Sequence, residues 1–139
     1  MGVMEKDAVK FTVDQVRALK RIAQEKKLKG ADVLNEYTDE QMAQEFNGAG
    51  GVETPEWQRW MLTQILKKKM PAVLIHDIEY LKGGKEKDFL RANDNLRDNI
   101  LAMDNDEGSK WWQFAARKAK ELTDEYGRPG WKAASSERT

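Results

Sequence analysis

The 139-residue chain contains no cysteine and only one histidine, and its basic and acidic side chains are equal in number at 24 each. The absence of cysteine excludes a disulfide framework, a thiolate nucleophile and a cysteine-ligated zinc site. The single histidine, His76, excludes a metal site with several histidine ligands, so any imidazole chemistry must use this residue. The balance of charge argues against a nucleic-acid-binding protein, which usually carries a clear basic excess.

Long apolar runs are missing as well. No stretch approaches the roughly 18 apolar residues that a membrane-spanning helix needs. Residues 1–7 lack the apolar segment of a signal peptide. We therefore expect no transmembrane segment and no signal peptide. A cytoplasmic location fits the absence of cysteine, because core packing has to replace disulfides in a reducing compartment.

The apolar residues that are present recur at helical spacing through most of the chain. Thr12 with Gln15, and Thr38 with Gln41, have the spacing of capping boxes, and Pro71 suits the first turn of a helix. The pattern predicts helices from residue 13 to shortly before 30, from 39 to 46, from 54 to 69, from 72 to 81, from 86 to 103 and from 110 to 126. We expect one all-α domain over residues 1–139, with a core at about 12–126 and with frayed residues at 1–10 and 127–139.

A histidine and an aspartate are adjacent on the helix predicted at 72–81. At about 100° per residue, Val73, His76, Asp77 and Tyr80 share one face, which should point inward. Burying a carboxylate costs several kcal/mol unless the group is paired or bound to a cation. Two interpretations stay open on this evidence: a satisfied core histidine beside a lysine-paired aspartate, or a functional site.

The segment Asn47-Gly48-Ala49-Gly50-Gly51 holds three glycines in five residues, which favours an irregular loop. Such a loop can turn several backbone carbonyls toward a hard cation such as calcium, or present N–H groups to an anion. Taken alone, it is better explained as a plain connection between helices. Together with a buried Asp77 downstream, it becomes a candidate calcium site.

The loop and the His-Asp motif, in this order, resemble the phospholipase A2 superfamily, which carries an x-Cys-Gly-x-Gly-Gly loop and a downstream His-Asp-x-x-Tyr helix. Asn47 replaces the cysteine of the loop, and Glu79 stands where many secreted members have another cysteine. Residues 38–100, about half of the chain, are also similar to small phage and prophage proteins with an Asn-Gly-x-Gly loop and an Ile-His-Asp-x-x-Tyr helix. The resemblance implies a phospholipase A2-like all-α fold with an antiparallel helix pair at the site, and a phage-associated location as an alternative.

The same resemblance implies calcium-dependent hydrolysis of a phospholipid ester at a membrane surface. His76 would be the general base, and calcium with the Gly48 N–H would stabilise the developing oxyanion. The residues matched to catalytic positions are His76, Asn93, Tyr80 and Gly48, and those matched to calcium ligands are Asp77 and the backbone carbonyls of Phe46, Gly48 and Gly50.

One departure leaves the activity open. In active members an aspartate on the next long helix orients the histidine, whereas the inward position here is Asn93 and Asp94 lies about 100° round the helix. An asparagine can accept the imidazole N–H but brings no charge to the imidazolium, so Asn93→Asp should raise hydrolysis. The alternatives are a weak hydrolase, a non-catalytic phage-derived binding or structural protein on the same scaffold, and a helical interaction module whose glycine loop has no function.

Tryptophans and lysines give weaker signals. We expect Trp57, Trp60, Trp111 and Trp112 to lie in the core, although tryptophan also anchors proteins at membrane interfaces. The cluster Lys67-Lys68-Lys69 is typical of a solvated helix end, and it could also draw the protein to anionic lipid.

Overall fold

The computed structural model of the chain describes residues 11–46, 68–103, 109–128 and 131. Within these residues there is no strand, which confirms the predicted all-α class. The elements are α2 (Val13–Glu25), the 3-10 helix η1 (Ala31–Glu36), α3 (Asp39–Glu45), α5 (Met70–Lys82), α6 (Glu86–Ala102) and α7 (Lys110–Tyr126). Residues 1–10, the glycine loop at 47–51, the helix predicted from Thr54 with Trp57 and Trp60, and most of the tail after 128 lie outside the described residues.

Both predicted capping boxes are confirmed. Thr12 Oγ1 accepts the Gln15 N–H at 3.1 Å, and Gln15 Oε1 accepts the Thr12 N–H at 2.8 Å. Thr38 and Gln41 repeat this arrangement at 3.0 and 2.9 Å. Each box satisfies N–H groups that the first turn of a helix leaves without an intrahelical acceptor, so the starts of α2 and α3 are set locally.

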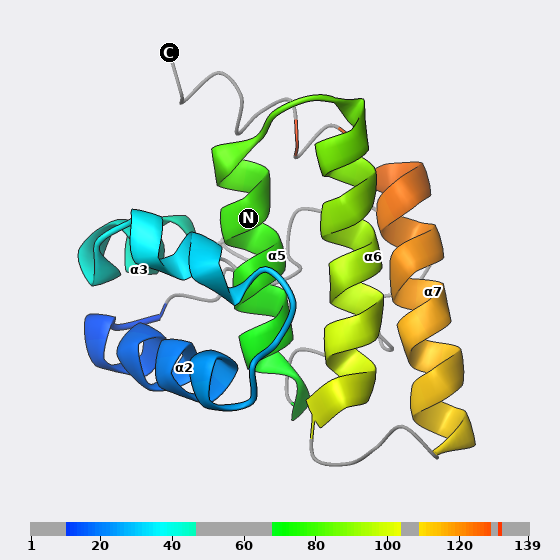
Figure 1. Cartoon of the computed structure of the whole chain (residues 1–139), viewed down its shortest axis with the longest axis horizontal. Coiled ribbons are helices and arrows are strands. Elements are labelled where there is room, and N and C mark those ends of the chain that lie inside the picture. The colour runs from blue at the N-terminus through cyan, green and yellow to red at the C-terminus, as the bar shows by residue number, and fades with distance from the viewer. Residues whose placement is uncertain (1–10, 47–67, 104–108, 129–130, 132–139) are drawn as a thin grey trace, which may run out of the picture.

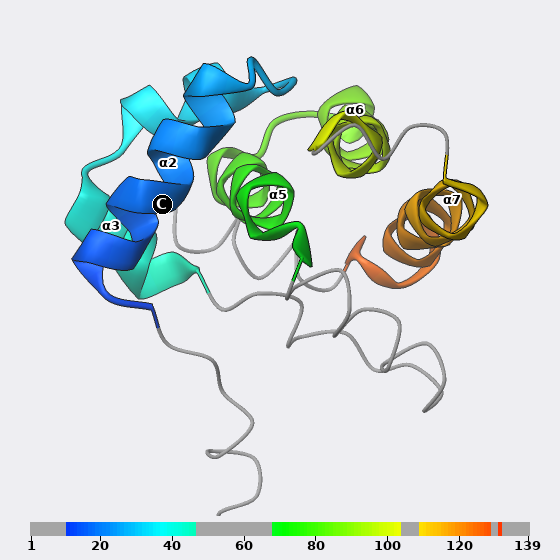
Figure 2. The same cartoon turned by 90° about the horizontal axis from the view of Figure 1, so that it is seen from below.

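The helices α5, α6 and α7 lie side by side in a row with α6 in the middle, and α2, η1 and α3 pack on the other side of α5 (Figures 1 and 2). Because α5 is covered from two sides, its buried residues surround the helix axis rather than forming one stripe. They are Pro71, Ala72, Val73, Leu74, Ile75, His76, Ile78 and Tyr80. His76 therefore sits on the central helix of the fold. None of the described helices is long and apolar enough to span a bilayer.

The lysine cluster before α5 differs from the prediction. Lys69 is 0% exposed, its Nζ donates to the Met103 carbonyl oxygen at 3.1 Å, and it lies 4.5 Å from the centre of the Trp112 ring. The expectation of a solvated cluster is wrong for this residue, because a carbonyl and an aromatic face replace its water. Trp112 is partly buried against the core as expected, whereas Trp111 is 40% exposed, contrary to the expectation.

A buried asparagine ties the segment before η1 to α6. Asn99 is 1% exposed, its Oδ1 accepts the Lys29 N–H at 2.7 Å, and its Nδ2 donates to the Lys29 carbonyl at 2.8 Å. We expect Asn99→Ala to lower the free energy of unfolding by about 2 kcal/mol, because both backbone groups of Lys29 lose their partner. Urea denaturation measures this loss. The exposed Asn35→Ala is the control, and an equally small effect of the two changes would contradict the prediction.

Candidate functional site

The predicted pairing of His76 with Asn93 is confirmed. His76 Nε2 lies 2.8 Å from Asn93 Oδ1, and the Tyr80 hydroxyl donates to the same oxygen at 2.8 Å. His76 is 7% exposed and Asn93 is 0% exposed, so the three side chains form a polar cluster inside the helix row. Asp94 faces away from the imidazole, as predicted, and its Oδ1 lies 3.3 Å from Lys120 Nζ and 3.8 Å from Arg97.

A residue that the sequence did not suggest completes this cluster. Asn93 Nδ2 donates to Asp124 Oδ1 at 2.9 Å, which links α6 to α7. The other carboxylate oxygen of Asp124 pairs with Lys120, one turn earlier on α7. His76, Asn93, Asp124 and Lys120 therefore form one continuous chain of polar contacts across three helices.

The electrostatics of the cluster keep the histidine neutral. Burial lowers the pKa of His76 from 6.5 to about 4, and the hydrogen bond to Asn93 opposes this shift only in part. Burial also raises the pKa of the Tyr80 hydroxyl, to which the charges of Asp124 and Asp77 add. At pH 7 both groups are uncharged, and His76 Nε2 must carry the ring proton because the atom facing it is a carbonyl oxygen.

Aromatic rings cover one side of this cluster. The Tyr80 ring lies 4.3 Å from the His76 ring and 5.3 Å from the Trp131 ring, which also contacts Phe89 at 5.5 Å between centroids. A Cβ added at Gly127 would lie 2.4 Å from the Tyr80 hydroxyl, so the chain passes too close for any side chain. Gly127 and Trp131 are thus packed on the site, and the rest of the tail for which fraying was predicted, apart from Arg128, lies outside the described residues.

The expected calcium ligands lie partly within the described residues. Asp77 is half-buried on α5 beside His76, and its Oδ2 is inaccessible to solvent. Phe46 follows α3, with its ring buried and stacked on Phe11 at 4.2 Å between centroids. Gly48 and Gly50 lie outside the described residues. In the described part of the chain, no group of three or more His, Asp or Glu side chains is placed to hold a metal, so carbonyls would have to complete such a site.

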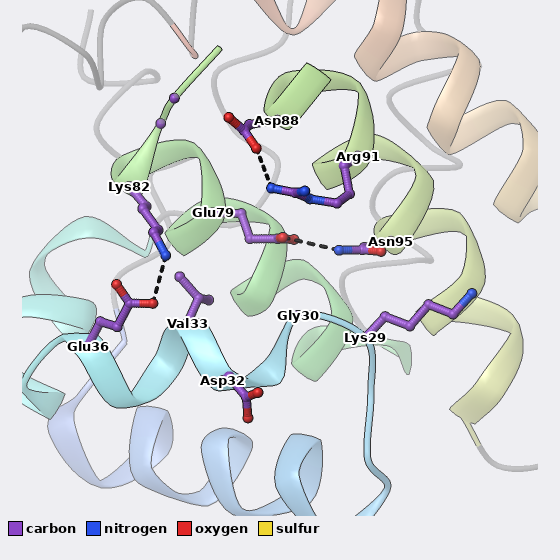
Figure 3. Close-up of a pocket in the computed structure, with 12 residues that line it drawn as sticks. Lys29, Gly30, Asp32, Val33, Glu36, Glu79, Lys82, Asp88, Arg91 and Asn95 are labelled. Atoms are coloured by element: carbon purple, nitrogen blue, oxygen red, sulfur yellow. Dashed lines mark hydrogen bonds and ion pairs between the residues drawn. The ribbon is translucent and has the colours of Figure 1, made fainter. Parts of the chain in front are cut away.

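A hollow of about 870 Å³ lies between η1, α5 and α6 (Figure 3). Most of the charges around it neutralise one another: Lys82 donates to Glu36 at 2.8 Å, and Arg91 pairs with Asp88. These exposed ion pairs account for four of the charged side chains around the hollow, and each contributes little to stability.

Glu79 is the exception in this hollow. Its Oε2 accepts from Asn95 at 3.1 Å, while its Oε1 is buried and receives no hydrogen bond from the described residues (Figure 3). Gly30, with φ of +81°, approaches so closely that an added Cβ would lie 3.0 Å from Oε2. Burial raises the pKa of Glu79 to about 7, against the smaller opposing effects of Asn95, Arg91 and Lys82.

Sequence reasoning thus found the histidine, its asparagine partner and the tyrosine, but missed Asp124 and Lys120. The only available signal was their i, i+4 spacing on α7, which is equally typical of a surface ion pair. No family model, curated protein or solved structure matches this chain.

Proposed function

We propose that the protein is a calcium-dependent phospholipid ester hydrolase of phospholipase A2-like type, with low turnover. The observation that supports this most strongly is the buried His76–Asn93–Tyr80 cluster, in which a neutral imidazole is held by an acceptor on Nε2. On this proposal α5 and α6, joined by the short connection at 83–85, are the antiparallel pair of a phospholipase A2-like scaffold.

His76 acts as the general base. Its Nε2–H is committed to Asn93 Oδ1, so the lone pair available to take a proton from water is on Nδ1. The ring gains a positive charge in this step, and Asn93 stabilises it only through a dipole. A base with a pKa near 4 is weak, and a weak base gives slow proton abstraction. The neutral partner of His76 and the low pKa of its imidazole therefore both predict low turnover.

Calcium would be held by Asp77 together with the backbone carbonyls of Phe46, Gly48 and Gly50. Among the described residues, the Asp77 carboxylate and the Phe46 carbonyl are hard oxygen donors of the kind that calcium prefers. When bound, the ion would polarise the ester carbonyl.

The first turns of α7 support contact with a phospholipid surface. Trp111 and Phe114 are 40% and 37% exposed, and their ring centroids lie 6.2 Å apart, so they form one exposed aromatic patch. Arg117 and Lys118 lie 5.8 and 5.9 Å from the centre of the Phe114 ring. Exposed aromatic rings next to cations are typical of surfaces that enter the headgroup region of a bilayer.

A second candidate is a non-catalytic, phage-derived binding or structural protein that keeps this scaffold. Two observations favour it: the partner of His76 is a neutral amide, and burial makes the imidazole a poor base. On this interpretation, the cluster serves only to satisfy polar groups inside the helix row.

The two candidates differ in turnover. We expect the protein to hydrolyse phospholipid in mixed micelles when calcium is present, and to lose this activity to background in His76→Gln, because the base is gone. Asp77→Asn should also abolish it and should remove the rise in melting temperature that calcium brings, because the single carboxylate ligand is lost.

Asp94→Asn is the matched control, since Asp94 is a neighbouring carboxylate on α6 that faces away from His76. It should keep both the activity and the calcium effect. A calcium-induced rise in melting temperature without turnover would favour the non-catalytic candidate, and identical melting curves with calcium and with chelator would contradict the calcium site.

A further inference from the structure

The cluster contains an ambiguity that an aspartate in place of Asn93 would not have. An asparagine presents a carbonyl oxygen on one side and an amide NH₂ on the other, and the two ends have nearly the same shape. With Oδ1 toward His76, the imidazole carries its proton on Nε2 and has its lone pair on Nδ1. With Nδ2 toward His76, Nε2 would have to accept, and the proton would move to Nδ1.

Tyr80 does not resolve this ambiguity. Its hydroxyl lies 2.8 Å from the Asn93 side chain, and a hydroxyl can rotate to donate to an oxygen or to accept from an amide. Both amide orientations therefore satisfy Tyr80. Burial does not resolve the ambiguity either, because the oxygen and the NH₂ group of the amide are removed from water together in both orientations.

Asp124 does resolve it. An ionised carboxylate only accepts hydrogen bonds, so Asp124 Oδ1, 2.9 Å from Asn93 Nδ2, requires the NH₂ end to point at α7. Lys120 pairs with the same carboxylate and also bridges to Asp94 at 3.3 Å, which holds the charge in place. A charge-assisted hydrogen bond of this kind favours one orientation over the other by roughly 10- to 100-fold.

We propose that Asp124 is a positioning residue of the site: through the Asn93 amide it fixes His76 as the Nε2–H tautomer and so keeps Nδ1 as the proton acceptor. Its usefulness rests on the proposed function, because a fixed tautomer matters only where His76 acts as a base. The tautomer itself is a property of the folded protein and can be measured whether or not the protein turns over substrate.

The test uses the fact that His76 is the only histidine of the chain. In protein labelled with ¹⁵N-histidine, the ring nitrogens of one residue give all the signals, and their shifts report which nitrogen carries the proton. At about pH 8 the ring is neutral, so the spectrum reads the tautomer alone. We expect a protonated Nε2 and an unprotonated Nδ1 in the unaltered protein, in a ratio above roughly 10:1.

Asp124→Asn is the decisive variant, because it keeps the shape of the side chain and can pair with either orientation of the Asn93 amide. We expect the tautomer ratio to fall by roughly tenfold or more. Asp94→Asn removes the other carboxylate that Lys120 contacts, and it should leave the ratio unchanged. Because both changes are nearly isosteric and affect partly exposed side chains, the fold should be kept, and melting curves check this.

The spectrum and the hydrolysis assay separate this inference from the proposed function. A shifted ratio in Asp124→Asn supports the positioning role even if no variant hydrolyses phospholipid, in which case the proposed function alone fails. If the protein is active, kcat should fall with the fraction of Nε2–H tautomer while KM stays constant. An unchanged ratio in Asp124→Asn overturns the inference, whatever the activity.

Discussion

The double exchange Asn93→Asp with Asp124→Asn is expected to raise phospholipid hydrolysis by on the order of 10²- to 10⁴-fold. It moves the negative charge from α7 to the position that touches the imidazole, while the introduced amide can still donate across the same 2.9 Å contact. The upper end of this range is the loss that the reverse exchange, Asp→Asn beside the catalytic histidine, causes in serine proteases, about 10⁴-fold. Initial rates on mixed micelles with calcium measure the gain.

The single exchange Asn93→Asp is the informative control. It places a second carboxylate against Asp124 in a position that is 0% exposed, so we expect it to lower the free energy of unfolding by about 3 kcal/mol. Adding Asp124→Asn should recover most of this loss, since the two carboxylates no longer face each other. A double variant that is as unstable as the single one, or no more active than the unaltered protein, would contradict the prediction.

The second large effect concerns the pH dependence of stability and involves two groups on α5 that act in opposite directions, the buried His76 and the half-buried Glu79. In calcium-free buffer, we expect the stability of the unaltered protein to depend little on pH between 4.5 and 6.5, where the contributions of His76 and Glu79 cancel. Replacing either side chain should reveal the pH dependence of stability that the other one causes. Urea denaturation at a series of pH values measures all variants in the same way.

The signs follow from proton uptake. The pKa of His76 falls from 6.5 to about 4 on folding, so the unfolded chain binds more protons in this window and stability rises with pH from 4 to 6.5. The pKa of Glu79 rises from 4.5 to about 7, so the folded protein binds more protons and stability falls as pH rises from 4.5 to 7. Each contribution amounts to about 3 kcal/mol across its window.

In Glu79→Gln, stability should therefore rise by about 3 kcal/mol between pH 4 and 6.5, and in His76→Gln it should fall by a similar amount between pH 4.5 and 7. The double variant should be as flat as the unaltered protein. The other carboxylates contribute the same background to all four proteins, so only differences between them are compared. The same dependence of the free energy of unfolding on pH in the unaltered protein and all three variants would contradict the prediction.

Much of the fold could be predicted because its signals are local. The starts of α2 and α3 depend on Thr12 and Thr38, each with a glutamine three residues on, and these contacts need nothing outside their own first turn. The bounds expected for the last helix, 110–126, agree with α7. The 3-10 helix η1 was not predicted. Its N-cap is Gly30, which has a φ of +81° and lies close to Glu79 and Asn95 on other helices, and the local sequence does not indicate these contacts.

The candidate site could likewise be predicted only where its signals are local. Asn93 could be placed opposite His76 because the apolar stripe of its own helix fixes which face points inward. Asp124 could not be placed next to Asn93, since this contact depends on how α7 packs against α6. Lys69 was misjudged for the same reason: the carbonyl that accepts its hydrogen bond belongs to Met103, which follows 34 residues later in the chain at the end of α6.

The place of α7 at the end of the helix row has a consequence for how the site is assembled. α7 lies at the end of the row and packs chiefly on α6, so essentially one interface holds it on the domain (Figure 1). Detachment would leave His76 paired with Asn93 but would remove Asp124 and uncover Tyr80 at Gly127. The fraction of molecules with a complete site would then depend on the equilibrium between docked and detached α7. Mild denaturant can shift this equilibrium before the whole protein unfolds.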